Sequence, residues 1–319
     1  MNYVILIIGF ALLIKGADIF VGGASAVAKK LGIPPVIVGL TIVSIGTSAP
    51  ELAVSIISAL NGNNEIAIGN VVGSNLFNML MVLGLTTMVL PMIIKKEKIK
   101  TDFFINIFVT VLLFVLTFDS ILGSTNNIIS RIDGMILVII CIAYIGFLVF
   151  KAKKTNMLNQ TQEEKNINVL GKIIAIIIGA IGIVLGGQLV VDSATNIAYS
   201  IGMSEKLVGL TIVAMGTSLP ELVTSVVAAV KGEKDIALGN VLGSIIFNIL
   251  LIIGVSAFIS PIPVAKTLIV DFIFLIVISI LVFGLIFLNK KQEKKISRVE
   301  GAILVVLYVG YIIYIICRN

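Results

Sequence analysis

The sequence predicts an all-α integral membrane protein of ten transmembrane helices, arranged as two inverted five-helix repeats. Three observations predict this fold: an apolar composition, a series of apolar stretches of about 20 residues, and a long internal repeat. Of the 319 residues, 58% are hydrophobic and 13% are charged, and the mean hydropathy is +1.16. Soluble domains hold only ~45 to 50% apolar residues, so a water-soluble core is excluded.

Ten apolar stretches can be placed on the chain as helical spans, because each can cross a hydrocarbon layer of ~30 Å. The first has no basic segment before it and no evident cleavage site, so we expect a retained span and not a signal peptide. No stretch alternates apolar and polar residues as a membrane β-strand does. The expected spans are residues 3–28, 34–60, 66–92, 102–120, 130–150, 170–200, 205–230, 235–260, 264–288 and 299–317.

The basic residues predict the orientation of these spans. If the N-terminus is outside, 18 of the 23 Lys and Arg residues fall in cytoplasmic connections, as the positive-inside rule requires. We therefore expect a multi-pass protein of the cell membrane with both termini extracellular. The net charge of +6 follows from this asymmetry, and nucleic-acid binding is not expected.

A duplicated segment divides the chain into two halves. The sequence GLTIVSIGTSAPE at 39–51 returns as GLTIVAMGTSLPE at 209–221, and GNVVGSNLFN at 69–78 returns as GNVLGSIIFN at 239–248. At this offset of 170, 25 of the 46 positions from 39 to 84 are identical, which indicates a duplicated structural unit. Five spans per unit place the second unit in the membrane upside down. We expect a first repeat over 1–150, a cytoplasmic linker over 151–169 and a second repeat over 170–319.

Glu51 and Glu221 are carboxylates at equivalent places in the second and seventh spans. A charge at the bilayer centre costs at least ~2.5 to 3.5 kcal/mol, so each glutamate needs a partner or water. The apolar parts of spans two, three, seven and eight hold no Lys or Arg that could neutralise them. Bound cations are therefore the expected partners, and protonated or water-exposed packing residues are the alternative.

Pro50 and Pro220 directly precede these glutamates and predict broken helices. Proline has no N–H and clashes with the preceding turn, so the carbonyls near Gly46 and Gly216 should leave the helical hydrogen-bond ladder. Irregular backbone at membrane depth is tolerated where it lines a cavity. We expect these carbonyls to serve as ligands for a hard cation.

Hydroxyl and amide side chains accompany the carboxylates in both repeats. A Thr-Ser pair stands one turn before each glutamate, where helical spacing would place it on the same face: Thr47 and Ser48, and Thr217 and Ser218. The third and eighth spans add a serine and an asparagine four residues apart, each of which could instead bond a neighbouring helix: Ser74 and Asn78, and Ser244 and Asn248. These oxygen donors suit Ca²⁺ and Na⁺ and do not suit soft metals.

Other notable residues have simpler expected roles. Cys141 and Cys317 lie in separate apolar stretches, and the chain has no His, so we expect core packing for both cysteines. The GxxxG spacings at 69–73 and 239–243 are typical of closely packed helices. Lys15 and Asp18 in the first span and Asp192 in the sixth have no repeat equivalents, and we expect intrahelical or interfacial charges.

The paired motifs GTSAPE with GNVVGSNLFN, and GTSLPE with GNVLGSIIFN, resemble the two alpha repeats of the sodium/calcium exchanger family, within the calcium/cation antiporter superfamily. Ten spans over the whole chain are similar to its prokaryotic members. The resemblance implies secondary antiport of Na⁺ against Ca²⁺ by alternating access. It also implies a central calcium site with flanking sodium sites, built from Glu51, Glu221, Thr47, Thr217, Asn78 and Asn248 with Ser48, Ser218, Ser74, Ser244 and the carbonyls of Ser44 and Ala214.

Three features distinguish this sequence from other branches of the superfamily. Potassium-dependent members carry an aspartate at the position of Asn248, so the resemblance implies transport without potassium. Ile245 stands where the first repeat has Asn75, which makes the two halves of the site unequal. The GN-x-x-E element of proton/calcium relatives is absent.

Two rival functions remain open at this point. One is proton/calcium exchange or exchange of another divalent cation. The other is an ion channel, which would need a ring of ligands that usually comes from several subunits. An enzyme or an ATP-driven pump is not expected, because the chain has no GxxxxGK[ST] phosphate loop. We expect no cofactor, and the expected partners are Ca²⁺, Na⁺ and the lipid bilayer, with no obligatory protein partner.

Overall fold

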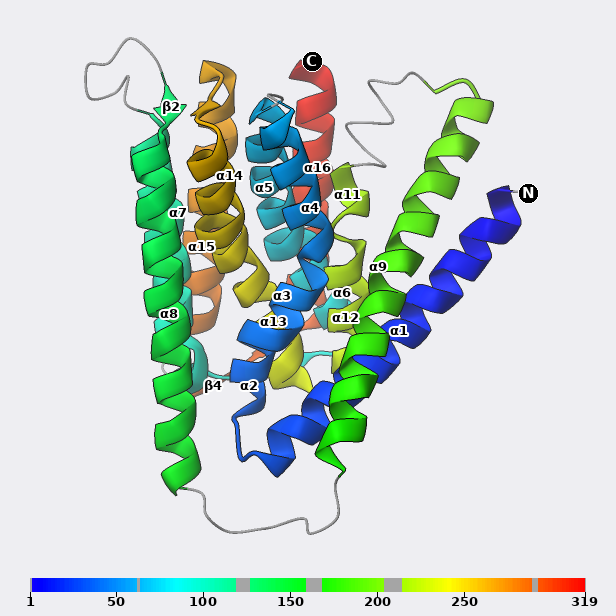
Figure 1. The fold of residues 1–319 in the computed structure, drawn as a ribbon, viewed down its shortest axis with the longest axis vertical. Helices are drawn as coiled ribbons and strands as arrows, with labels where there is room; N and C mark the ends of the chain where they lie inside the picture. Colours follow the sequence, from blue (N-terminus) through cyan, green and yellow to red (C-terminus); the bar gives the residue numbers. More distant parts are fainter. Residues whose placement is uncertain are drawn as a thin grey trace.

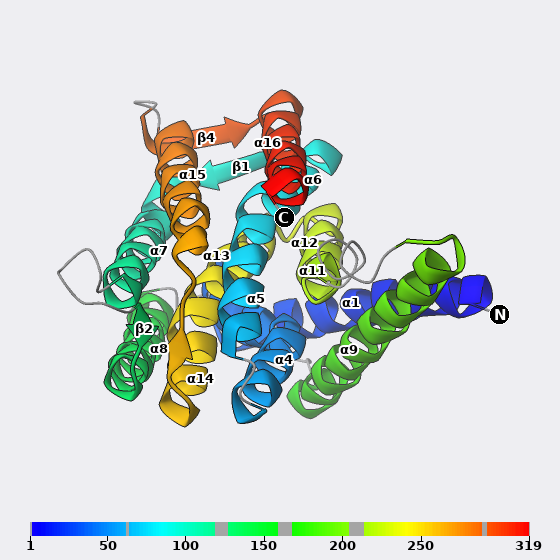
Figure 2. The ribbon, with the colours of Figure 1, turned by 90° about the horizontal axis from the view of Figure 1, so that it is seen from above.

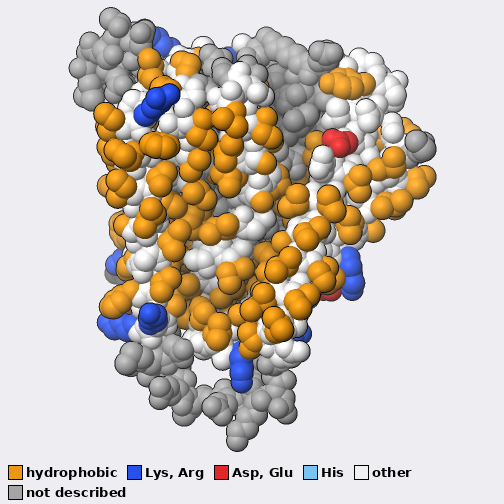
Figure 3. All heavy atoms as spheres, in the orientation of Figure 1, with side chains coloured by type: hydrophobic (Ala, Val, Ile, Leu, Met, Phe, Trp, Pro, Cys, Tyr) orange, Lys and Arg blue, Asp and Glu red, His pale blue; other side chains and the backbone are white. Residues whose placement is uncertain are grey.

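The computed structural model describes residues 2–61, 64–118, 127–158, 168–203, 214–288 and 292–318, and these residues are almost entirely helical. Within them, eight helices are long and apolar enough to cross a membrane, and a bent helix pair makes a ninth. The all-α membrane fold is thus confirmed. Figure 3 shows apolar side chains over the sides of the molecule, as lipid contact requires, with Lys and Arg mainly towards the lower end.

The second span is broken, as its proline predicts. Helix α2 (Pro35–Val38), the π-helix η1 (Gly39–Val43) and α3 (Ser44–Thr47) lead to α4 (Ala49–Leu60). The two parts of this span meet at an angle of 49°. Its counterpart in the second repeat contains α11 (Ala214–Gly216) and α12 (Leu219–Val230), and the start of the expected span at 205–230 lies outside the described residues.

The third and eighth spans form the buried centre of the molecule. The third consists of α5 (Asn64–Leu76), the π-helix η2 (Phe77–Val82) and α6 (Leu83–Val89). The eighth consists of α13 (Lys234–Phe247), the π-helix η5 (Asn248–Ile253) and α14 (Gly254–Ile259). Both spans therefore change to π geometry at nearly the same point of the repeat, and such π segments are frequent at functional sites.

Six long helices surround this centre. They are α1 (Asn2–Lys30), α7 (Lys96–Thr117), α8 (Arg131–Leu158), α9 (Val169–Ser200), α15 (Ile269–Phe287), which follows the short 3-10 helix η6 (Lys266–Leu268), and α16 (Arg298–Arg318). Seen from above, α1 and α9 lie on one side of α5 and α12, and α7 and α8 lie on the other (Figure 2). Helix α8 continues to Leu158, eight residues beyond the expected end of the first repeat at 150.

Two short antiparallel strand pairs show that the repeats are inverted. Strand β1 (Met92–Lys95) pairs with β4 (Glu293–Ile296), and β2 (Ile128–Ile129) pairs with β3 (Ile262–Pro263). Strands β1 and β3 are repeat equivalents, and so are β2 and β4. Figure 1 places β2 and β4 at opposite ends of the molecule, and α1 and α9 start from opposite ends. Each strand pair also joins one repeat to the other.

The fifth helix of each repeat packs on the third span of the other repeat through glycines. A Cβ on Gly134 of α8 would lie 2.7 Å from the carbonyl oxygen of Gly254, and a Cβ on Gly301 of α16 would lie 2.7 Å from that of Gly84. Since Gly84 and Gly254 are repeat equivalents, the two contacts are the same contact made twice. The two repeats therefore interleave and share one buried core.

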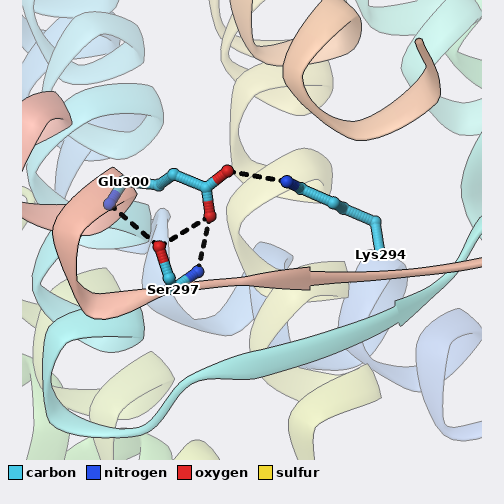
Figure 4. A network of polar contacts seen from close by, with 3 residues as sticks. All are labelled: Lys294, Ser297 and Glu300. Carbon is cyan, nitrogen blue, oxygen red and sulfur yellow. Dashed lines mark hydrogen bonds and ion pairs between the residues drawn. The ribbon is translucent and has the colours of Figure 1, made fainter. Parts of the chain in front are cut away.

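Helix α16 begins with a capping box, in which Ser297 and Glu300 satisfy each other's backbone N–H groups. The Ser297 N–H donates to Glu300 Oε2 at 2.7 Å, the Glu300 N–H donates to Ser297 Oγ at 3.3 Å, and Lys294 Nζ lies 2.7 Å from Glu300 Oε1 (Figure 4). Ser130 and Asp133 repeat the box at the start of α8. The same cap fixes the start of the fifth helix in both repeats.

The expected helix contacts at the GxxxG spacings are present in the second repeat. A Cβ on Gly239 would lie 2.9 Å from Gly39 Cα, and one on Gly243 would lie 2.8 Å from the carbonyl oxygen of Leu40. These glycines let α13 approach η1 closely. A Cβ on Gly69 or Gly73 meets no described atom within 4 Å, and the repeat equivalent of η1, residues 209–213, lies outside the described residues.

Candidate functional site

Glu51 and Glu221 lie in the first turns of α4 and α12 and are fully buried. Each carboxylate accepts a hydrogen bond from a serine of the other repeat: Ser218 Oγ donates to Glu51 Oε1 at 3.0 Å, and Ser48 Oγ donates to Glu221 Oε1 at 2.8 Å. Neither Oε2 has a hydrogen-bond partner among the described residues. The positive ends of two helices thus support two carboxylates, each with one oxygen free for another ligand.

Two further serines complete the ring of hydroxyls around the carboxylates. Ser244 Oγ lies 3.5 Å from Glu221 Oε1, and Ser74 Oγ lies 2.9 Å from Ser218 Oγ. Both serines are buried, one in each of the two central spans. The structure therefore brings together the two glutamates and the four serines that the sequence singled out.

The two threonines form hydrogen bonds with asparagines of the opposite repeat. The break at Ser48, whose φ is −83° and ψ is 11°, interrupts the helical spacing that would place Thr47 and Ser48 on the face of Glu51. Ser48 reaches Glu221 instead, and Thr47 Oγ1 donates to Asn240 Oδ1 at 3.0 Å. In the other half, Thr217 Oγ1 donates to Asn70 Oδ1 at 3.3 Å. The expectation of a shared helical face was wrong because the bend redirects both side chains across the repeats.

Asn78 is the second residue of the π segment η2, Asn248 is the first residue of η5, and both are fully buried. Asn248 Nδ2 donates to Asn75 Oδ1 at 3.0 Å, and Asn75 Nδ2 donates to the carbonyl oxygen of Ile245 at 3.4 Å. Asn75 and Ile245, which occupy equivalent positions but differ between the repeats, are therefore in direct contact. Both polar atoms of Asn78 and the Oδ1 of Asn248 lack a hydrogen-bond partner in the described part of the chain.

The two expected backbone ligands differ from each other. The carbonyl oxygen of Ser44 accepts from the Ser48 N–H at 2.9 Å and lies 3.3 Å from Thr47 Oγ1. The equivalent Ser218 N–H donates at 3.2 Å to Met215 and not to Ala214, which is the first residue of α11. The break in the seventh span is therefore tighter by one residue than the break in the second.

Sequence reasoning missed four residues that complete the network. Asn240 Nδ2 donates to the Glu221 carbonyl at 3.3 Å and to Ser225 Oγ at 2.9 Å, and Asn70 Nδ2 donates to the Glu51 carbonyl at 3.4 Å and to Ser55 Oγ at 3.2 Å. Both asparagines and both serines are identical at the offset of 170. Their identity in both repeats is the sequence feature that could have indicated a role in the site.

The two ends of the site differ in exposure. Thr47 and Asn240 are fully buried, whereas Thr217 and Asn70 are half-buried. Thr217 follows α11, and Figure 1 shows α11 on the side of α12 that faces the two chain termini. The pair of Thr217 and Asn70 is therefore less deeply buried than the pair of Thr47 and Asn240.

The donor set suits hard cations. Carboxylate, hydroxyl, amide and carbonyl oxygens are the ligands of Ca²⁺ and related ions. Within the described residues, no group of three or more His, Cys, Asp or Glu side chains could hold a metal ion, and no Lys or Arg forms a salt bridge with Glu51 or Glu221. The arrangement therefore presents two carboxyl groups and several neutral oxygens close together, which is the donor set that small hard cations prefer.

A family model for the sodium/calcium exchanger protein matches residues 1–151 and 171–317. The chain belongs to the sodium/calcium exchanger family. The family is one of membrane transporters, and membership covers both repeats and the residues of the site described above. The recognition based on the paired motifs is thus confirmed.

Individual relatives match over most of their length. The sodium/calcium exchanger MaX1 of Methanosarcina acetivorans is 34% identical over 344 aligned positions, which cover 98% of this chain and 97% of that protein. The inner membrane protein YrbG of Escherichia coli is 36% identical over 265 positions, 81% of this chain and 79% of that protein. Among solved structures, the sodium-calcium exchanger NCX_Mj soaked with Na⁺ and Ca²⁺ has a TM-score of 0.82 and 31% identity, with 98% of this chain and 97% of that chain covered. Family and structure support sodium/calcium antiport and do not favour the proton/calcium alternative.

Proposed function

We propose that the protein exchanges Na⁺ for Ca²⁺ at the buried carboxylate pair by alternating access. The observation that carries this proposal is the pair of glutamates itself. Glu51 and Glu221 are fully buried, accept hydrogen bonds from serines of the opposite repeat, and each has one carboxylate oxygen without a partner among the described residues. Ca²⁺ binds between the glutamates with Thr47, Thr217, Asn78 and Asn248, and Na⁺ binds in flanking positions with Ser48, Ser74, Ser218, Ser244 and the carbonyls of Ser44 and Ala214.

Charge balance makes the exchange obligatory. Two carboxylates are neutralised by one Ca²⁺ or by at least two Na⁺. An empty site would carry two bare charges through an occluded state of low dielectric constant, which is very costly. Only ion-loaded forms cross, so each ion that leaves is replaced by its competitor. The process is transport of ions, with no chemical reaction and no cofactor.

The half-buried Thr217 and Asn70 support ion entry from the end that carries the chain termini. With the orientation that the positive-inside rule favours, this end is extracellular, and the protein is a multi-pass protein of the cell membrane. The paired outer helices α1 and α9 pack through close glycine contacts, such as that of Gly16 with Gly182. They are the elements best placed to move together against the site.

The proposal is tested by uptake of ⁴⁵Ca²⁺ into proteoliposomes loaded with Na⁺. Wild-type protein should accumulate Ca²⁺ when Na⁺ is inside and not when choline replaces it. Glu51→Gln and Glu221→Gln should each abolish this uptake while remaining folded, since removing a charge from the membrane interior does not hinder insertion. Glu293→Gln, on the exposed strand β4, is the matched control and should transport normally.

A pH gradient distinguishes sodium/calcium exchange from the rival function, proton/calcium exchange. In the same vesicles, an imposed pH difference without Na⁺ should drive no Ca²⁺ uptake. Uptake driven by the pH difference alone would identify proton exchange. Near-normal sodium-driven uptake by either glutamine variant would contradict the paired-carboxylate site.

A further inference from the structure

A four-residue arrangement occurs twice in the site and crosses the repeats each time. In one copy, Asn240 connects Thr47 of the first repeat with Glu221 and Ser225 of its own repeat. In the other copy, Asn70 connects Thr217 of the second repeat with Glu51 and Ser55. The two copies have the same donors and the same acceptors, although 21 of the 46 positions around them differ between the repeats, the complement of the 25 that are identical.

The orientation of each amide is fixed by what its nitrogen touches. Asn240 Nδ2 faces two acceptors, the carbonyl oxygen of Glu221 at 3.3 Å and Ser225 Oγ at 2.9 Å. An amide nitrogen can only donate, so this end of the side chain must point at those oxygens. The amide oxygen is then left to face Thr47, which lies 3.0 Å away.

The amide oxygen in turn determines how the threonine can act as a ligand. A hydroxyl has one proton to donate and two lone pairs that accept. If the proton is free to rotate, it can point at an incoming cation and repel it. Thr47 Oγ1 faces two acceptors, Asn240 Oδ1 at 3.0 Å and the carbonyl oxygen of Ser44 at 3.3 Å. When the nearer Asn240 Oδ1 holds the proton, the lone pairs of Thr47 are available to the cation. Asn70 does the same for Thr217.

We propose that Asn240 and Asn70 are positioning residues that turn Thr47 and Thr217 into cation ligands with a fixed orientation. This role rests on the proposed function, because it concerns the affinity of the same site. Each asparagine also holds the backbone of the glutamate on its own repeat, so it links the carboxylate of one half to the hydroxyl ligand of the other. Groups that orient ligands in this way typically contribute about 10- to 100-fold to metal affinity.

The two copies should contribute unequally. Thr47 and Asn240 are fully buried, whereas Thr217 and Asn70 are half-buried. Water can replace part of a lost hydrogen bond at the half-buried copy and cannot do so at the fully buried copy. Substitution of Asn240 should therefore weaken Ca²⁺ binding more than the same substitution of Asn70.

The test compares Asn240→Leu and Asn70→Leu with Asn106→Leu in proteoliposomes. Asn106 is a fully buried asparagine of α7 whose amide atoms have no hydrogen-bond partner in the described part of the chain, so it is the matched control. Asn240→Leu should raise the KM for Ca²⁺ about 10-fold or more, Asn70→Leu by less, and Asn106→Leu should leave KM unchanged. Equilibrium Ca²⁺ binding by calorimetry should shift in the same order.

A double variant identifies the route of the effect. If Asn240 acts through Thr47, Thr47→Val should raise KM by itself and adding Asn240→Leu should raise it little further, while Thr47→Ser, which keeps the hydroxyl, should stay near wild type. Additive effects of the two changes, or a KM of Asn240→Leu within twofold of wild type, would overturn the proposal. Wild-type flux in the same preparation shows separately whether sodium/calcium exchange itself holds.

Discussion

The uncharged side chain of Asn248 limits how many positive charges the site can hold. Its amide brings an oxygen without a charge, so the centre has two carboxylates and not three. A potassium ion added to a full complement of sodium would leave surplus positive charge in a low-dielectric occluded state, which is unfavourable. We expect sodium-driven Ca²⁺ flux to be unchanged when choline replaces potassium on both sides of the vesicle.

The Asn248→Asp variant provides the converse of this prediction. A third carboxylate should change the ion requirement, by admitting potassium or a proton as an additional charge. The control is Asn75→Asp, which alters the hydrogen-bond partner of Asn248 and separates the effect of position from that of charge. Collapse of wild-type flux without potassium would contradict this interpretation of Asn248.

At the residue level, the sequence predicted the chemistry of the site better than its contacts. The glutamates, serines and asparagines of the motifs could be found because a repeat preserves them at one offset. The partners of Thr47 could not be found, since they depend on a bend of 49° that helical spacing does not describe. Asn70 and Asn240 lay inside the quoted motifs, but their contacts with the opposite repeat appear only once the chain is folded.

At the level of helices, the fourth and fifth of each repeat are joined by a buried acid, a tyrosine and a basic residue. Asp102 of α7 accepts from Tyr144 Oη at 3.3 Å and pairs with Lys151 Nζ at 3.2 Å. Asp271 of α15 accepts from Tyr311 Oη at 3.0 Å and pairs with Arg318 at 2.9 Å. Both aspartates are buried, and their basic partners are about one quarter exposed, at 26% and 24%. The two clusters hold equivalent helix pairs together.

We expect Asp102→Asn and Asp271→Asn to destabilise the protein to a similar degree. Each loses hydrogen bonds to a charged group, which contribute about 1.5 to 3 kcal/mol. Reversible denaturation in detergent, followed by circular dichroism, measures the change. Lys95→Gln, which removes an exposed ion pair with Glu293, is the control and should cost less than about 1 kcal/mol. Equal losses in the control and the aspartate variants would show that burial of the clusters does not matter.

These clusters also show why the repeat was only partly recognised. The second and third spans match the seventh and eighth at an offset of 170. The fifth helices match at an offset of 167, at which Ser130 corresponds to Ser297, Tyr144 to Tyr311 and Lys151 to Arg318. A search at one offset misses the second match. The capping boxes and the acid clusters are therefore not found from the offset of 170 alone.

At the scale of the whole molecule, the two ends differ although the repeats are alike. Lys231, which caps the C-terminus of α12, pairs with Asp18 of α1 at 2.7 Å, so Asp18 has an interhelical partner besides the expected Lys15. Glu233 lies 3.4 Å from Lys29. The repeat equivalents of Asp18 and Lys231 are Gln188 and Asn61, which carry no charge. Among the described residues, the Asp18–Lys231 ion pair thus joins α1 to the C-terminal end of α12, and Gln188 and Asn61 cannot form the equivalent pair.

Loss of these pairs should open that end. In a Cys317→Ser background, Val227→Cys reports access to the space between α1 and α12, where Val227 lies beside Lys15, Asp18 and Lys231. We expect Lys231→Gln to speed its labelling by an impermeant maleimide about two- to fivefold, because exposed pairs contribute only ~0.2 to 1 kcal/mol. Lys295→Gln on β4 is the control. An unchanged labelling rate in Lys231→Gln would show that the Asp18–Lys231 pair does not limit access to this space.

The position of the chain termini gives the last prediction, which concerns orientation. Figure 1 shows both termini at one end of the molecule, and Figure 3 shows most of the visible Lys and Arg at the other. Because basic residues are retained on the cytoplasmic side, we expect both termini to be extracellular. In a Cys317→Ser background, an impermeant reagent should reach a cysteine tag after Asn319 in intact cells. In the Lys153→Cys variant, the same reagent should label the new cysteine, near the end of α8, only after permeabilisation. The opposite pattern would reverse the orientation and, with it, the side from which the half-buried Thr217 is reached.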